Sequence, residues 1–157
     1  MQIKLIFTGK TENIYLKNEL SEYFKRINHY ISLEIKEINN LKNTGKLTSD
    51  IQKIKEGELI LKLISGKDYL ILLDEKGKEF SSQGFSKFIE NKLSSGQKNI
   101  FFVIGGAYGF SEDVCKRADL KISLSKFTFP HQLVRVIFLE QLYRAFTIMK
   151  GEKYHHE

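Results

Sequence analysis

The sequence predicts an α/β fold of three layers, in which a mainly parallel sheet is flanked by helices. Two observations carry this prediction. Segments with strand patterning alternate with amphipathic segments along the 157 residues, an order typical of parallel sheets with crossover helices. Residues 69–73 and 100–104 are continuous apolar runs bounded by glycine or charge, as expected of strands covered on both faces. The length is that of one domain, which we expect to span residues 1–157.

The first half of the chain predicts two strands and two helices. Residues 2–8 alternate apolar and polar side chains and predict a strand, and residues 32–38 predict another near an edge of the sheet. Residues 12–29 carry apolar side chains at helical spacing, at Leu16, Leu20, Tyr23, Phe24 and Ile27. The polar residues 39–48 predict a loop, after which Ser49 begins a helix that reaches about Ile64.

The second half continues the alternation. A helix is expected near residues 82–94, between the strands at 69–73 and 100–104. A glycine turn then leads to a short helix from Ser111 and a strand at 122–124. The last helix begins at Pro130, whose fixed φ is tolerated in a first helical turn, and reaches about Met149.

The last helix is apolar on more than one face. One stripe consists of Val134, Ile137, Phe138, Leu142, Ala145, Phe146 and Met149, and Leu133, Val136, Leu139 and Tyr143 lie off it. A surface helix needs only one stripe, so either this helix is buried within the monomer or its second face meets another subunit. Glu140 and Arg144 have the i,i+4 spacing of an ion pair within the helix. The alternative is that these polar residues form a site at a dimer interface.

Charge and composition limit the class of protein. The net charge of +6 suits a polyanionic partner such as nucleic acid, although a merely basic protein would look the same. No apolar run approaches the roughly 18 residues of a membrane span, and the N-terminus lacks the pattern of a secretory signal. Cys115 is the only cysteine, so no internal disulfide forms and we expect a cytoplasmic protein. Cys115 itself is expected to be a small buried side chain.

The glycines at 105, 106 and 109 follow a buried strand, where they either allow a ligand to approach the backbone or form a tight turn. Their spacing is neither a dinucleotide fingerprint nor a Walker loop, and Glu112 and Asp113 in the next helix would repel a phosphate. The histidines and Cys115 lack zinc-ligand spacing, so we expect no metal.

Taken together, several segments resemble one family. They are residues 102–109 (FVIGGAYG), 123–132 (SLSKFTFPHQ), Arg135, 140–145 (EQLYRA) and the Gly151-x-x-Tyr154-His155 ending, with weaker matches at 9–10, 55–58 and 73–78. The sequence is similar to the ribosomal RNA large subunit methyltransferase H family of the SPOUT superfamily. The similarity is strongest over residues 100–155 and covers essentially the whole chain.

This resemblance implies a fold and an activity. The fold is a parallel α/β sheet with a deep C-terminal trefoil knot, here in about residues 100–150. The cofactor is S-adenosylmethionine, and the substrate is a pseudouridine of 23S rRNA, methylated at N3 on the assembled ribosome. Members are homodimers with their sites near the subunit interface. A non-catalytic nucleotide- or RNA-binding module is the competing class, and thermal stabilisation by S-adenosylmethionine would discriminate between them.

The resemblance also implies site residues. Leu73 ends the third strand and lines the adenosine pocket, Gly105 opens the glycine turn where a side chain would block the cofactor, and the knot loop supplies backbone hydrogen bonds and apolar walls through Leu124, Ser125, Lys126, Phe127, Thr128 and Phe129. Candidate catalytic residues are His155, Tyr154 and Arg144. His155 is the expected base if it reaches the target, and His131 is the second candidate. Some relatives carry a basic residue where this chain has His156, which is mostly uncharged at neutral pH.

Overall fold

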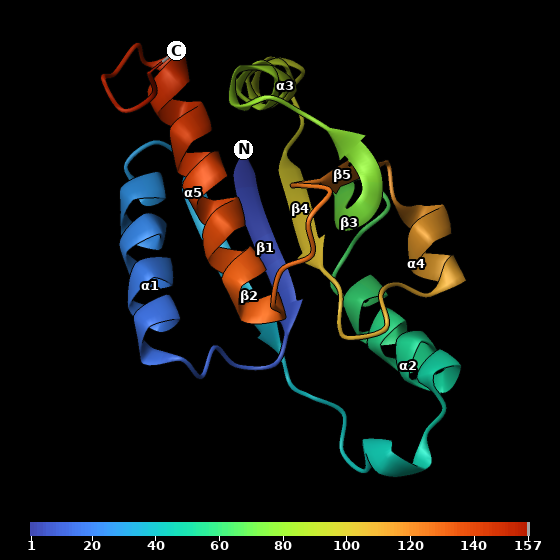
Figure 1. The fold of residues 1–157 in the computed structure, drawn as a ribbon. Helices are drawn as coiled ribbons and strands as arrows, with labels where there is room; N and C mark the ends of the chain where they lie inside the picture. The colour runs from blue at the N-terminus through green and yellow to red at the C-terminus, as the bar shows by residue number, and fades with distance from the viewer. Residues whose placement is uncertain (157) are drawn as a thin grey trace.

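The computed structural model describes residues 1–156. Its middle layer is a five-stranded sheet in the order β2-β1-β4-β3-β5 (Figure 1). The strands are β1 (Gln2–Thr8), β2 (Ser32–Ile38), β3 (Tyr69–Glu79), β4 (Asn99–Ile104) and β5 (Leu120–Ser123). All four strand pairings are parallel. The predicted parallel sheet is therefore confirmed, and so is the edge position of residues 32–38.

Helices cover both faces of this sheet (Figure 1). Helices α1 (Ile14–Asn28), α3 (Ser82–Ser94) and α5 (His131–Met149) lie on one face, and α2 (Ser49–Leu61) and α4 (Glu112–Arg117) lie on the other. A single 3₁₀ turn at Thr44–Lys46 lies in the predicted loop. Alternate residues of β1 serve the two layers, since Ile3, Leu5 and Phe7 join one core and Ile6 joins the other.

Side-chain caps explain where most helices begin. Asn13, Thr48, Ser81 and Ser111 each accept hydrogen bonds from backbone N–H groups in the first turn of the helix that follows. The helix predicted from residue 12 therefore starts at Ile14. The helix predicted to reach Ile64 ends at Leu61, where Lys62 is its C-cap.

Helix α5 packs between α1 and α3, and its buried face differs from the predicted stripe. Phe138, Leu142, Ala145 and Phe146 are buried as expected, and so is Leu139, at 0% exposure. Val134, Ile137 and Met149, assigned to the same stripe from the sequence, are only half-buried. Val134 and Met149 nevertheless pack against the same core. Leu139 joins it because the two neighbouring helices, α1 and α3, define a contact face broader than an ideal helical stripe.

Strand β3 is longer than predicted. Its pairing with β4 ends at Leu73, but the strand continues to Glu79 and rejoins β5 after a shift in register between Leu73 and Lys78. The expectation that Leu73 ends the strand is thus wrong. Gly77 permits the continuation, because a Cβ there would lie 2.6 Å from backbone atoms of Ile122.

No helix among residues 1–156 has the length and apolar character to cross a membrane. The chain passes from β5 over the carboxyl ends of the strands to α5 (Figure 1). The trefoil knot in about residues 100–150 stays a prediction.

Candidate functional site

A cavity of about 710 Å³ opens at the carboxyl ends of β3 and β4. This edge is where open parallel sheets bind ligands. Its walls come from the end of β3, the glycine turn, the loop between β5 and α5, and the first turn of α5. They include Leu73, Asp74, Glu75, Lys76, Ile104, Gly105, Gly106, Ala107, Tyr108, Gly109, Phe110, Cys115, Lys121, Ile122, Leu124, Ser125, Phe127, Thr128, Phe129, His131 and Val134.

The structure brings most of the predicted cofactor residues together at this cavity. Leu73, Gly105, Leu124, Ser125, Phe127, Thr128 and Phe129 all line it. Lys126 belongs to the same loop, but its side chain is exposed and is not part of the wall. His131, the second candidate base, is at the cavity, whereas His155 is not among the residues that line it.

The glycine turn is shaped by the side chains of Phe110 and Glu56. A Cβ at Gly105 would lie 3.1 Å from Cζ of Phe110, so the glycine makes room for a phenyl ring that itself lines the cavity. A Cβ at Gly106 would collide with the carboxylate of Glu56. Glu56 is only 6% exposed and accepts a hydrogen bond from Gln52 Nε2 at 3.1 Å. At both glycines, therefore, an added Cβ would contact another side chain of the protein.

The loop between β5 and α5 is held by serine hydroxyls. Ser123 Oγ donates to the carbonyl of Ser125 at 2.9 Å, and the amide of Phe127 donates to Ser125 Oγ at 3.0 Å. Phe127 is 80% exposed, although its ring borders the cavity. A large aromatic side chain that faces solvent at the mouth of a cavity is available to contact a ligand.

Charged groups of both signs line one wall. Lys121 Nζ lies 3.2 Å from Sγ of Cys115 and 3.9 Å from Oδ2 of Asp74. Cys115 packs against the core on the α2 and α4 side of the sheet, as expected of a small apolar side chain, but it is only half-buried and also lines the cavity. This contact could not be predicted from the sequence, because it depends on the path of the turn between α4 and β5, which brings Lys121 back to Cys115.

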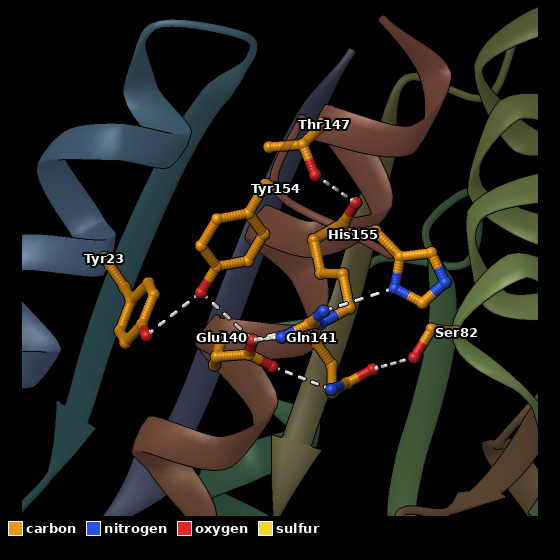
Figure 2. A network of polar contacts seen from close by, with 8 residues as sticks. Tyr23, Ser82, Glu140, Gln141, Thr147, Tyr154 and His155 are labelled. Carbon is orange, nitrogen blue, oxygen red and sulfur yellow. Dashed lines mark hydrogen bonds and ion pairs between the residues drawn. The ribbon is translucent and has the colours of Figure 1, made fainter. Parts of the chain in front are cut away.

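A second cluster joins the end of the chain to helix α5 (Figure 2). Glu140 Oε1 accepts hydrogen bonds from Arg144 Nε at 3.0 Å and from Tyr154 Oη at 3.1 Å, and it also pairs with Arg144 Nη2. Arg144 Nη1 lies 3.2 Å from His155 Nδ1. The three predicted catalytic residues are therefore in one cluster, and the ion pair predicted from the i,i+4 spacing is confirmed.

Neighbouring elements hold this cluster. Gln141 Nε2 donates to Glu140 at 2.7 Å, and Ser82 Oγ of α3 donates to Gln141 Oε1 at 2.9 Å. Tyr23 Oη of α1 lies 3.5 Å from Tyr154 Oη (Figure 2). The pKa of Tyr154 is raised above its ordinary range, mainly by burial and next by the hydrogen bond with Tyr23. Sequence patterning treated Tyr23 only as a core residue, and its polar tip was the signal that could have placed it here.

The cavity and the cluster lie at different ends of helix α5. Val134 is the last residue of α5 that lines the cavity, and Arg144 lies ten residues further along. At the helical rise this is about 15 Å. Within one chain, therefore, the cavity and the predicted catalytic residues form two separate sites.

No group of three or more His, Cys, Asp or Glu side chains arranged to hold a metal ion occurs among residues 1–156.

Comparison with known sequences identifies the family to which a chain with this fold and this cavity belongs. Residues 1–155 match the family model described as "Predicted SPOUT methyltransferase", and the chain belongs to this family. It is an α/β methyltransferase family, in agreement with the five-stranded parallel sheet.

Individual relatives are similar over their full length. The proteins named "Ribosomal RNA large subunit methyltransferase H" from Christiangramia forsetii and Parabacteroides distasonis are each 54% identical to this chain, over 99% and 100% of both sequences. The protein of the same name from Bacteroides fragilis is 47% identical over 100% of both sequences. The family resemblance inferred from the motifs is confirmed.

Proposed function

We propose that this protein methylates large-subunit ribosomal RNA with S-adenosylmethionine, at N3 of a pseudouridine in the assembled ribosome. The observation that carries the proposal is the cavity at the carboxyl edge of the sheet, walled by the glycine turn and residues 124–129, in a chain of the SPOUT methyltransferase family. The names of its relatives support large-subunit rRNA as the substrate. A ribosomal substrate would place the protein in the cytoplasm.

The residues present fit this cofactor. Volumes of about 300–1,000 Å³ are usual for small-molecule sites, and the cavity of about 710 Å³ falls among them. Leu73, Ile104, Leu124 and Phe129 offer apolar contact to an adenosine. The cofactor carries no phosphate, so Glu112 and Asp113 in the first turn of α4 are compatible with it.

The bound cofactor would supply a methyl group attached to a sulfonium, an activated leaving group that departs as a neutral thioether. The chain then has to position the methyl group and the target nitrogen, and such positioning can lower the activation barrier by several kcal/mol. Residues 105–110 and 124–129 would hold the cofactor. The exposed Phe127 ring borders the place where a base would enter, and aromatic rings stack on unpaired RNA bases.

A dimer would complete the site. The cluster of Arg144, Tyr154 and His155 lies about 15 Å along α5 from the cavity of its own chain. A second copy that packs against α5 would bring its cluster to the cavity of the first. The half-buried Leu133, Val136 and Ile137 form a face of α5 suited to such isologous pairing. The net charge of +6 would favour the RNA backbone.

The decisive experiment is transfer of a labelled methyl group from S-adenosylmethionine to purified ribosomes, followed by mapping of the modified nucleotide. Ribosomes from a strain that lacks the modification are the substrate, and ribosomes already modified are the control. Label at N3 of one large-subunit pseudouridine is expected. Label elsewhere would contradict the substrate assignment, and no stabilisation by S-adenosylmethionine on heating would contradict the cofactor.

A further inference from the structure

One wall of the cavity is formed by two side chains of opposite charge. Asp74 and Lys121 both line the cavity, and their side chains are 22% and 37% exposed. Oδ2 of Asp74 lies 3.9 Å from Nζ of Lys121. This distance is longer than a hydrogen bond between nitrogen and oxygen, so the two groups attract each other mainly through their charges. A partly exposed pair of this kind contributes little to stability, and a ligand can therefore replace either partner at small cost.

The irregular pairing of β3 places the carboxylate at this wall. Strand β3 pairs with β5 at Leu73 and again only from Lys78. Asp74 is the first of the residues between these two positions, which lie outside the regular pairing. Its Oδ1 accepts a hydrogen bond from the amide of Lys76 at 2.9 Å, a local turn that is typical of aspartate. Because the backbone of its own segment holds Oδ1, the side chain has a defined orientation with Oδ2 toward Lys121.

The ammonium group of Lys121 is held by a neighbouring sulfur. Its Nζ lies 3.2 Å from Sγ of Cys115, which also lines the cavity. A lysine ammonium has three N–H donors, and a cysteine sulfur is only a weak acceptor. Nζ can therefore donate to a ligand while it keeps this contact. An ionised carboxylate accepts several hydrogen bonds, so Asp74 can also accept from a ligand. The wall thus offers one anionic acceptor and one cationic donor.

We propose that Asp74 and Lys121 bind the amino-acid end of S-adenosylmethionine. The carboxylate of Asp74 accepts from the α-ammonium of the ligand, and the ammonium of Lys121 donates to its α-carboxylate. This inference rests on the proposed function, in which this compound occupies the cavity. An α-amino acid carries both charges on one carbon, so they lie within a few ångströms of each other, as the two side chains do. Hydrogen bonds between such charged groups are stronger than those between neutral groups.

The other walls of the cavity are less suited to a zwitterion. Apolar side chains that fit an adenine ring come from Leu73, Ile104, Leu124 and Phe129. A charged group that leaves water needs a partner of opposite charge, which these walls do not supply. Glu75 and Lys76 also line the cavity, but both are exposed, where water and salt screen their charges. Because Asp74 and Lys121 together are neutral, we expect them to recognise the amino-acid end of the ligand and not the charge on its sulfur.

Calorimetry with two thioether ligands isolates the amino-acid end without any measurement of activity. S-adenosylhomocysteine and methylthioadenosine share the adenosine and a neutral sulfur, and only the first carries an amino acid. The ratio of their dissociation constants within one variant cancels a general distortion of the cavity. Asp74→Asn and Lys121→Met should each weaken S-adenosylhomocysteine by about tenfold or more and leave methylthioadenosine within about twofold. In the control, Glu112→Gln, which breaks an exposed ion pair with Lys116 outside the cavity wall, both affinities should stay unchanged.

A third ligand tests which side chain binds which charge. In this ligand an aminopropyl group replaces the amino-acid end, so the ammonium is kept and the carboxylate is missing. Asp74→Asn should still weaken its binding, whereas Lys121→Met should not, and the reverse pattern would overturn the assignment. If either variant kept the unchanged ratio between the two thioether ligands, this inference alone would fail. If the unchanged protein bound neither S-adenosylmethionine nor S-adenosylhomocysteine, the cofactor of the proposed function would fail with it.

Discussion

The hydroxyl of Tyr154 donates to Oε1 of Glu140 at 3.1 Å, which fastens the end of the chain to helix α5. The ring of Tyr154 also packs edge-on against Tyr143, with centroids 4.8 Å apart. Just before it, Glu152 accepts a hydrogen bond from Tyr30 Oη at 2.7 Å. Chain ends are usually mobile unless they are tied down, and this one is tied to both α1 and α5. A docked chain end can present His155 in a defined orientation.

Removal of residues 152–157 tests whether this docked end serves catalysis. Glu157, the last residue of that segment, lies outside the described residues. We expect the fold and the affinity for S-adenosylmethionine to stay nearly intact, because the cavity is about 15 Å away along α5. Methylation of ribosomes should fall by about a hundredfold or more. Deletion of residues 156–157 alone, which spares Tyr154 and His155, is the control. Full activity in the longer deletion would show that the chain end is dispensable.

Gly105→Val tests the cavity. The new Cβ would lie 3.1 Å from the ring of Phe110, so the ring must move and reshape the wall that it forms. We expect a folded protein whose binding of S-adenosylmethionine is no longer detectable by calorimetry. The control is Gly66→Val, since a Cβ there meets nothing within 4 Å. Unchanged affinity in Gly105→Val would count against the cavity as the cofactor site.

Glu140→Gln tests the cluster that holds the chain end. It removes the charged acceptor of Arg144 and Tyr154 from a largely buried position, so the free energy of unfolding should fall by about 1–3 kcal/mol. Hydrogen exchange at residues 152–156 should become faster, because their anchor on α5 is weakened. In the control, Glu90→Gln, the ion pair with Lys87 is exposed, and a change within about 0.5 kcal/mol is expected. Equal effects in the two variants would mean that the cluster adds no stability.

Alkaline pH should weaken the folded state through two tyrosines. Burial raises the pKa of both Tyr154 and Tyr30 above the ordinary value of 10.0. Below that value both states are protonated and the stability is fully present. As the pH rises further, the unfolded chain releases protons that the native state retains, so the free energy of unfolding falls, by at most about 1.4 kcal/mol per pH unit for each tyrosine.

Urea denaturation from about pH 9 to about pH 11 measures this decline. The double variant Tyr30→Phe/Tyr154→Phe should show a shallower fall than the unchanged protein. If the free energy of unfolding fell equally steeply with pH in the two proteins, Tyr30 and Tyr154 would not be the cause of the decline.

Ile137→Glu tests the dimer. Ile137 lies on α5 and is only half-buried by its own chain, and a carboxylate at a subunit interface would be desolvated without a partner. In sedimentation at micromolar concentration, the unchanged protein is expected to be a dimer and this variant a monomer. Ile54→Glu, at a position 51% exposed on α2, should stay dimeric. A monomeric unchanged protein would exclude the dimer altogether.

The predicted elements agree with the structure where local patterning decides. The apolar runs at 69–73 and 100–104 became the parts of β3 and β4 that are buried on both faces, and the alternating residues 32–38 became the edge strand. The errors arose where a distant segment decides. Strand β3 continues past Leu73 because β5 pairs with it again from Lys78. No pattern within residues 74–79 predicts pairing with a strand more than forty residues away.

The site residues divide in the same way. The resemblance of residues 102–109 and 123–132 to a known family led to Leu73, Gly105 and the loop 124–129, which lie around one cavity apart from the side chain of Lys126. The contact of Glu56 with Gly106 and that of Ser82 with Gln141 could not be foreseen. Each joins segments about fifty residues or more apart, and a single sequence contains no record of such pairs.

By itself, then, the sequence determined the order of strands and helices, because hydrophobic periodicity is a local property that follows from which faces are covered. Its motifs also determined the family. Only the tertiary structure decided which side chains meet: Phe110 with Gly105, Lys121 with Cys115, and Arg144 with both Glu140 and His155. Hydrogen bonds and packing depend on distances of a few ångströms, and those distances are set by how the layers stack. For the same reason, the structure alone separated the cavity from the docked chain end.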